Sequence, residues 1–243
     1  MSKNHKEILI WGAGKIGRGF IADLFSREGY TLTFIDVDKT LVESLKTRAK
    51  YTIMNLPGEN ESEEVIIEGF SVIHLGEKEK VLEKLSGCSL IALTVFPTVF
   101  EETAREIASA IEQRIAKGIE SPMDIIICAN IFHPSAKLRG FLEGFLSEAG
   151  KEYLDKWVGL IDTLVIRMGV EPTRQMKEKD PLVVLTNGYP ELTVDKSGFK
   201  GQLPAVKGIV ATENIAAEET RKMYTYNMIH AVYSYLGKQK GYE

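Results

Sequence analysis

The amino-acid sequence predicts an α/β fold, in which a doubly wound, mostly parallel β-sheet has helices on both faces and is followed by a partly helical second region. Two observations predict it. From the start of the chain to about Gly150, short apolar runs that suit buried strands alternate with amphipathic helical stretches, as in parallel sheets joined by crossover helices. A glycine-rich turn also separates the first strand from the first helix, as is typical of such sheets.

The first βαβ unit begins with Glu7–Trp11, a short apolar run that suits a buried strand. A helix follows through about Arg27, and its inner face carries five apolar side chains: Ile16, Phe20, Ile21, Leu24 and Phe25. A second strand, Thr31–Asp36, and a second helix, Lys39–Arg48, complete the unit.

The next segment interrupts this alternation. Two strand-like runs, Tyr51–Leu56 and Val65–Ile73, are joined by the polar loop Pro57–Glu63 and predict an inserted hairpin. The alternation then resumes with two more helices and two apolar strands, in the chain order Glu77–Leu85, Ser89–Val95, Val99–Lys117 and Asp124–Ala129.

The pattern changes after about Gly150. Three strands are favoured, with turn residues between them: Trp157–Met168, Leu182–Thr186 and Leu192–Asp195. A loop containing Gly and Pro, Ser197–Gly208, then leads to one long helix, Thr212–Leu236, for which Thr212 is the expected N-cap. We expect two parts in the chain, a domain at 1–195 and the start of a second region at 196–243.

The composition is that of an ordinary globular protein and argues against several classes. Of 243 residues 44% are hydrophobic, but no apolar run approaches the roughly 20 residues that span a bilayer. The start, Met1–Glu7, is polar and lacks the apolar stretch of a secretory signal, so we expect a cytoplasmic protein. The net charge of −4 argues against a general nucleic-acid surface, and a small-molecule partner is expected.

The cysteines and histidines offer no ligand set for a metal. Cys88 and Cys128 each lie within an apolar run, which predicts buried free thiols. No CxxC occurs, and the histidines are scattered along the chain at His5, His74, His133 and His230. Any mechanism is therefore expected to be free of metal.

The turn after the first strand carries the GxGxxG pattern Gly12, Ala13, Gly14, Lys15, Ile16 and Gly17. In this pattern the first glycine allows a tight turn, the second lets the backbone approach a pyrophosphate, and the third permits close packing of helix on strand. The pyrophosphate lies at the helix N-terminus, where N–H groups and the helix dipole favour an anion. Between a strand and a helix, the pattern predicts a Rossmann-type dinucleotide site.

The second strand ends at Asp36, 19 residues past Gly17. At this position an acid can accept hydrogen bonds from the hydroxyls of the adenosine ribose. Its charge also repels a 2′-phosphate, and the next residues, Val37 and Asp38, supply no arginine to hold one. The spacing therefore favours NAD over NADP.

Three polar residues of the long helix form a second concentrated signal: Lys222, Asn227 and His230. On a regular helix Asn227 lies about 140° and His230 about 80° from Lys222, so that the three share one side. A lysine whose pKa is lowered by burial can take a hydroxyl proton, and an asparagine can hold the developing alkoxide. Spacing alone, however, favours the plainer interpretation of a solvated lysine, an interior polar residue and a satisfied histidine.

The sequence resembles the polyol-specific long-chain dehydrogenases, the mannitol dehydrogenase family, and within it the mannitol-1-phosphate 5-dehydrogenase branch. The resemblance rests on GAGKIGRGFI at Gly12–Ile21, on VDKSGFKG at Val194–Gly201, and on the spacing Lys222-x4-Asn227-x2-His230. It runs along essentially the whole chain, and relatives continue into a sizeable helical domain. The resemblance therefore implies that 1–195 is the NAD-binding domain and that 196–243 begins a truncated substrate domain.

The resemblance also implies roles for single residues. Lys222 is the expected general base, Asn227 and Asn130 donate to the reacting oxygen, and His230 orients the substrate. Glu219, three residues before Lys222, is a weaker candidate for relaying the proton. Two positions depart from the family pattern: Ala129 stands in place of an acid, and Ile166-Arg167 stands in place of an Asp-Arg pair.

The resemblance implies an NAD-dependent enzyme that interconverts mannitol 1-phosphate and fructose 6-phosphate by hydride transfer. Two alternatives stay open, a hexuronate (tagaturonate or fructuronate) reductase of the same family and an NAD-binding module without turnover. A phosphate needs basic partners, and four unranked candidates are Arg167, Arg174, Lys196 and Lys200.

Overall fold

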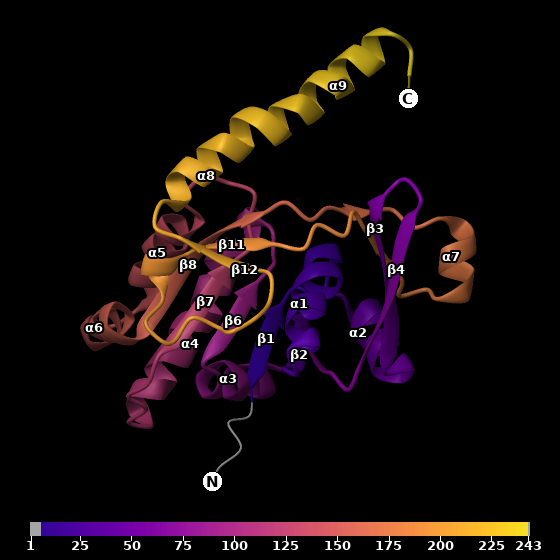
Figure 1. The fold of residues 1–243 in the computed structure, drawn as a ribbon. Helices are drawn as coiled ribbons and strands as arrows, with labels where there is room; N and C mark the ends of the chain where they lie inside the picture. Colours follow the sequence, from indigo (N-terminus) through magenta and orange to yellow (C-terminus); the bar gives the residue numbers. More distant parts are fainter. Residues whose placement is uncertain (1–5, 243) are drawn as a thin grey trace.

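The computed structural model describes residues 6–242 as an α/β body with one helix that stands away from it (Figure 1). Eight strands form the main sheet in the order β12-β11-β8-β7-β6-β1-β2-β5. Neighbouring strands are parallel throughout except for β8 and β11. The strands are β1 Glu7–Trp11, β2 Thr31–Asp36, β5 Ser71–His74, β6 Leu90–Leu93, β7 Met123–Ile127, β8 Val158–Val165, β11 Leu192–Asp195 and β12 Ile209–Thr212. The predicted doubly wound, mostly parallel sheet is confirmed.

Helices bury both faces of this sheet, which is why its central strands are apolar at almost every position. Along β1, Ile8 and Ile10 face one core while Leu9 and Trp11 face the other. The first core is closed by η1 Gly17–Ile21, α1 Ala22–Arg27 and α2 Lys39–Arg48. The second is closed by α3 Lys78–Gly87, α4 Phe100–Ala116, α5 Pro134–Phe145 and α6 Glu148–Trp157. The last two helices have no counterpart among the sequence predictions.

A second sheet has the strand order β4-β3-β10-β9. Its members are β3 Lys50–Gly58, β4 Glu61–Glu68, β9 Gly169–Val170 and β10 Val184–Thr186, and the short α7 Arg174–Lys179 lies between the last two. The predicted hairpin is present, but the prediction of one strand at Val65–Ile73 is wrong. Gly69 turns the chain with a φ of +70°, after which β5 joins the main sheet beside β2.

The end of the chain differs from the predicted single helix. Thr212 is not an N-cap, because Ile209–Thr212 pairs with β11 and extends the main sheet. The helix begins instead at Ile215, where the side chain of Asn214 accepts a hydrogen bond from the N–H of Ala217 at 3.1 Å. It continues as α8 Ile215–Lys222, a π-helical turn η4 Met223–Asn227, and α9 Met228–Gln239.

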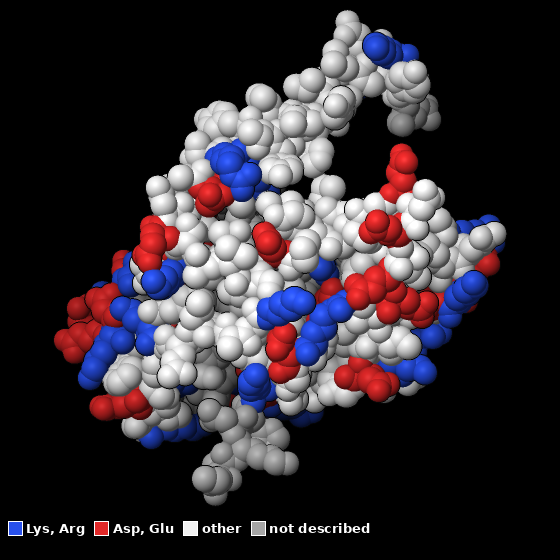
Figure 2. Space-filling view, viewed as in Figure 1, with Lys and Arg blue, Asp and Glu red and all other residues white. Residues whose placement is uncertain are grey.

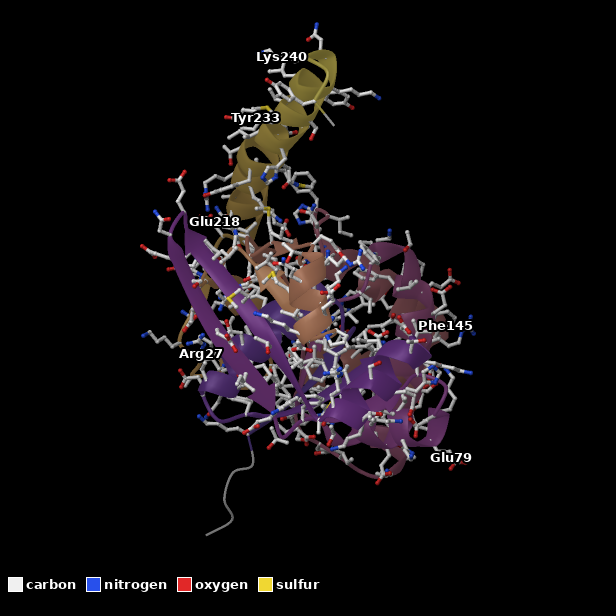
Figure 3. All side chains as sticks on the ribbon, turned by 90° about the vertical axis from the view of Figure 1, so that its right-hand side faces the viewer. Arg27, Glu79, Phe145, Glu218, Tyr233 and Lys240 are labelled. Carbon is white, nitrogen blue, oxygen red and sulfur yellow. The ribbon has the colours of Figure 1, made fainter. Side chains whose placement is uncertain are left out.

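The helix α9 leaves the body with none of its side chains buried. Figure 3 places Glu218 where the helix meets the body, with Tyr233 and Lys240 progressively farther out. Most of this helix carries no charge in Figure 2, and its exposed apolar side chains are Met228, Ile229, Val232, Tyr233, Tyr235 and Leu236.

Across residues 6–242 we find no helix with the length and apolar character needed to cross a membrane. The first five residues, on which the expected cytoplasmic location partly rests, lie outside the described range, and so does His5. Cys88 and Cys128 are free and buried, as predicted, and burial raises the pKa of each thiol to about 12.

Candidate active site

The glycine turn is shaped by two close approaches that only glycine allows. Gly12 has a φ of +103°, and a Cβ there would lie 2.8 Å from the carbonyl oxygen of Thr94. A Cβ on Gly17 would lie 2.0 Å from the carbonyl oxygen of Gly12. The hydroxyl of Thr94 donates to that same oxygen at 2.7 Å. These contacts hold the end of β1, the end of β6 and the start of the first helix together.

Gly14 is different, because a Cβ there would meet nothing within 4 Å. The first helix begins beside this open space, with a hydrogen bond from the N–H of Arg18 to the carbonyl oxygen of Gly14 at 3.0 Å. The N–H groups of a first helical turn have no partner within the helix and favour an anion. The turn therefore offers both the room and the donors that a pyrophosphate needs.

Asp36 lies beside this turn at the end of β2. Its carboxylate accepts hydrogen bonds from the N–H of Ala13 at 2.6 Å and from the N–H of Asp38 at 2.9 Å. Together with Gly12 and Val37 it lines a cavity of about 470 Å³ at the carboxyl ends of the strands, where α/β sheets bind ligands. Sequence spacing did not reveal Lys78 and Arg105, which also line this cavity.

A second cavity, of about 570 Å³, also borders the glycine turn. Ile16, from the GxGxxG pattern itself, forms part of its wall. The same cavity is lined by all four residues predicted to carry catalysis: Asn130, Lys222, Asn227 and His230. The structure thus brings the end of β7 and the late helix together next to the glycine turn.

Asn130 is the point on which this cluster converges. Its side-chain oxygen accepts a hydrogen bond from Lys222 Nζ at 2.9 Å and another from Asn227 Nδ2 at 3.3 Å. Asn227 Nδ2 also lies 2.7 Å from the sulfur of Met223. His230 lines the cavity without any of these contacts, and its side chain is exposed.

The π-helical turn explains how Lys222 and Asn227 reach the same oxygen. In a regular α-helix two residues five apart point about 140° apart. The turn Met223–Asn227 inserts one extra residue between them, so that Lys222, Asn227 and His230 take the relative places that i, i+4 and i+7 have on a regular helix. The three side chains therefore form a narrower stripe along the helix than the spread of about 140° predicted for a regular helix. The local sequence gave no sign of the π-turn that causes the difference.

Burial and one neighbouring carboxylate set the electrostatics of Lys222. Burial lowers the pKa of its ammonium group, and the charge of Glu219 raises it. Glu219 is itself only 4% exposed, and burial raises the pKa of its carboxyl group. Lys222 is therefore closer to its neutral, basic form than a solvated lysine.

Three of the four candidate phosphate ligands are held in ion pairs. Arg167 lines the Lys222 cavity but forms a buried ion pair with Asp23 at 2.5 Å and donates to the carbonyl oxygen of Tyr189 at 2.7 Å. Of the other three, Arg174 pairs with Glu178 and Lys196 with Glu213. Arg174, Lys196 and Lys200 are absent from the described wall of this cavity. Ala129 and Ile166, the residues that differ from the family pattern, do lie in the wall of the cavity.

The described residues contain no group of three or more His, Cys, Asp or Glu side chains arranged to hold a metal ion.

Comparison with known proteins gives one family and several solved folds. The family model described as "Mannitol dehydrogenase Rossmann domain" matches residues 6–208. The Pseudomonas fluorescens mannitol 2-dehydrogenase, solved as a ternary complex with NAD and D-mannitol, superposes with a TM-score of 0.84 at 17% identity, over 99% of this chain and 60% of that one. A D-sorbitol dehydrogenase in substrate-free form gives 0.78 at 12% identity, over 89% of this chain and 55% of that one.

A more distant likeness is to octopine dehydrogenase with NADH and L-arginine, with a TM-score of 0.59 at 12% identity, over 92% of this chain and 52% of that one. At such identities the likeness shows a shared fold. The chain spans 60% of the length of the mannitol 2-dehydrogenase and 55% of the length of the sorbitol dehydrogenase.

Proposed function

The chain belongs to the mannitol dehydrogenase family, and on that premise we propose that it is an NAD-dependent oxidoreductase that interconverts a polyol and its ketose in the Lys222 cavity. The observation that carries the proposal is the convergence of Lys222 and Asn227 on the side-chain oxygen of Asn130. This convergence supports the proposal because an amine of lowered pKa and two side-chain amides lie together beside the glycine turn.

NAD is the cofactor, and the chain's own residues divide its binding between the two cavities. The GxGxxG turn Gly12–Gly17 would hold the pyrophosphate in the open space beside Gly14, with the backbone N–H groups at the start of the first helix as donors. Asp36 accepts hydrogen bonds from the adenosine ribose in the cavity that it lines with Gly12. Bound NAD supplies the acceptor for the hydride. Ile16 lies in the wall of the Lys222 cavity and so joins the two halves of the site.

The polyol hydroxyl is activated by Lys222. Its neutral amine takes the hydroxyl proton, while the amides of Asn130 and Asn227 donate to the oxygen as negative charge develops there. His230, at the open side of the cavity, orients the substrate. Burial assists the first step because it lowers the pKa of Lys222 and so raises the fraction of neutral amine.

Mannitol 1-phosphate and fructose 6-phosphate are the substrate pair that we propose, on the strength of the GAGKIGRGFI segment at Gly12–Ile21. Of the four candidate phosphate ligands, only Arg167 lies in the described wall of the cavity, and Asp23 already pairs it, so this substrate pair needs a direct test. In a panel with NAD or NADH, we expect kcat/KM for mannitol 1-phosphate to exceed that for mannitol at least about 100-fold. A preference for tagaturonate or fructuronate would favour the hexuronate reductase instead.

We also propose that residues 1–195 form the NAD-binding part and that 196–243 begin the substrate-binding part. Lys222, Asn227 and His230 come from the second part and Asn130 from the first, so turnover needs both.

The enzyme hypothesis is tested by Lys222→Ala, with Lys238→Ala as the matched control because Lys238 is exposed on the same helix. Removing the base should lower kcat about 100-fold or more, while NADH binding, followed by its fluorescence, stays unchanged. The control variant should match the wild type. If the chain binds NADH but Lys222→Ala and the wild type give equal background rates across the panel, the protein is a binding module without turnover.

A further inference from the structure

A buried arginine contacts the glycine turn from inside the protein. Arg18 is 9% exposed, belongs to the π-helical turn η1, and lies in the described wall of neither the Asp36 cavity nor the Lys222 cavity. Its Nε atom donates a hydrogen bond to the carbonyl oxygen of Ala13 at 2.6 Å. Gly14, the next residue, is exposed. The guanidinium and the open space beside Gly14 therefore lie on opposite sides of the turn.

This contact sets the direction of one peptide group. The carbonyl of Ala13 and the N–H of Gly14 belong to the same peptide bond, and in a planar trans peptide they point in opposite directions. Because the carbonyl faces the buried guanidinium, the N–H of Gly14 faces the open space. That N–H has no hydrogen-bond partner among residues 6–242, whereas the N–H of Ala13 already donates to Asp36 at 2.6 Å. Of these two donors, Gly14 is the one that a ligand can use.

The charge of Arg18 has no carboxylate partner. Arginine stays protonated in proteins, but the hydrogen bonds of this guanidinium go to carbonyl groups, and it forms no ion pair with the described residues. Two acids act on it through their charge, Asp36 and Asp180, and both accept hydrogen bonds from backbone N–H groups instead. An unpaired buried charge is costly. A pyrophosphate at the turn would supply the missing negative charge.

The second sheet holds Arg18 in this position. The Nη1 atom of Arg18 donates to the carbonyl oxygen of Leu182 at 2.5 Å, two residues before β10. The buried hydroxyl of Tyr51, on β3, donates to the carbonyl oxygen of Arg18 at 2.9 Å, and the Tyr51 ring centre lies 5.4 Å from the guanidinium carbon. The inserted strands therefore fix a side chain that supports the glycine turn.

We propose that Arg18 is a positioning residue for the pyrophosphate of NAD. Its guanidinium holds the peptide between Ala13 and Gly14 so that the Gly14 N–H donates to a phosphate oxygen. Its positive charge stabilises the phosphates from the inner side of the turn, without touching them. The inference rests on the proposed placement of NAD at the glycine turn and is independent of the polyol chemistry.

Arg114 provides a matched control. It is also a buried arginine, 2% exposed, and its guanidinium likewise donates to backbone carbonyls, here those of Ser86, Cys88 and Ser121. Cys88 and Ser121 lie two residues before β6 and β7, at the amino ends of the strands and away from the glycine turn. Loss of either guanidinium removes buried hydrogen bonds, but only the loss of Arg18 should affect nucleotide binding.

The variants Arg18→Lys and Arg114→Lys therefore separate positioning from stability. A lysine keeps the charge but lacks the planar fork that bridges two carbonyl groups. We expect both variants to lower Tm, but only Arg18→Lys to weaken NADH binding, about tenfold or more. Adenosine, which has no pyrophosphate, should bind Arg18→Lys as it binds the wild type. Unchanged NADH affinity in Arg18→Lys, or an equal loss for NADH and adenosine, would overturn the inference.

A second measurement needs no variant of Arg18. In the wild type labelled with ¹⁵N-glycine, NADH should shift the amide resonance of Gly14 strongly, because this N–H gains a phosphate acceptor. The amide resonance of Gly12 should move less, because its N–H already donates to the carbonyl oxygen of Ile35 at 2.8 Å. If Asp36→Ala weakens NADH binding but Gly14 does not respond to NADH, the role of Arg18 is overturned. If Asp36→Ala has no effect either, the proposed placement of NAD is wrong.

Discussion

The two ends of the site are built from contacts of very different range. At the end that we propose binds adenosine, Asp36 accepts a hydrogen bond from the N–H of Ala13, 23 residues away, and both belong to one βαβ unit. At the end that we propose binds the polyol, Lys222 reaches Asn130 across 92 residues and from a helix that leaves the body. A local motif can thus fix the first end by itself, whereas the second end depends on the register of a helix against a distant loop.

The largest effect should come from changing that register. One alanine inserted after Tyr224, which is 66% exposed, adds a second extra residue to the π-turn and rotates Asn227 and His230 by about 100° relative to Lys222. We expect kcat to fall about 100-fold or more. Deleting Tyr224 should instead convert the π-turn to regular helix and keep Lys222 and Asn227 on one face, four residues apart.

The deletion variant should therefore retain activity within about tenfold of the wild type, since the three side chains keep their stripe. Polyol-dependent NADH formation measures both variants, and NADH fluorescence checks that the adenosine end is intact. Equal activity of the insertion and the deletion would contradict the importance of the stripe.

This contrast explains which parts of the structure were predictable. Glu7–Trp11, Thr31–Asp36 and Lys39–Arg48 were predicted with the bounds that they have, because each combines an apolar pattern with turn residues at its ends. Their short-range pattern also led to Asp36. The pairing of segments that lie far apart in the chain was less predictable from the sequence. Ile209–Thr212 has a weak pattern and becomes a strand only because β11 lies beside it, which is why Thr212 was mistaken for a cap.

The candidate site was predictable only through residue types. The spacing of Lys222, Asn227 and His230 pointed to the late helix only through the family resemblance, and no residue type marks the π-turn that aligns the three side chains. The ion pair between Arg167 and Asp23 was also missed, because it joins segments far apart in the chain.

A smaller effect is expected at the adenosine end from Asp36→Ala. Loss of the charged acceptor should weaken NADH binding about 10- to 100-fold and reduce the discrimination against NADPH, because the repulsion of a 2′-phosphate is gone. Fluorescence titration with both nucleotides measures this, with Glu43→Ala on the exposed face of α2 as a control. If neither affinity changes, the ribose does not lie at Asp36.

The pH dependence of turnover links the cluster to its buried acid. The base must be neutral, so the rate of polyol oxidation should rise with pH through the pKa of Lys222, which burial lowers. The charge of Glu219 raises that pKa, and Glu219→Gln removes the charge. The pH at which kcat reaches half of its maximal value should therefore be lower in the variant than in the wild type. This shift is expected whether or not the maximal kcat at high pH also changes. An inflection that stays in place would mean that another group controls the profile.

The smallest effect should come from the contact that joins the two ends. Lys15, within the GxGxxG pattern, forms an exposed ion pair with Glu171 at 2.7 Å. Gly169, two residues before Glu171, lies against the Lys15 side chain and also lines the Lys222 cavity. A pyrophosphate bound at the turn competes with Glu171 for this lysine. Glu171→Gln should therefore tighten NADH binding about two- to fivefold, a modest gain because exposed ion pairs are weak. Glu178→Gln, which breaks the pair with Arg174 in α7, is the matched control and should leave NADH affinity unchanged. Unchanged or weaker binding in Glu171→Gln would mean that Lys15 does not face the pyrophosphate.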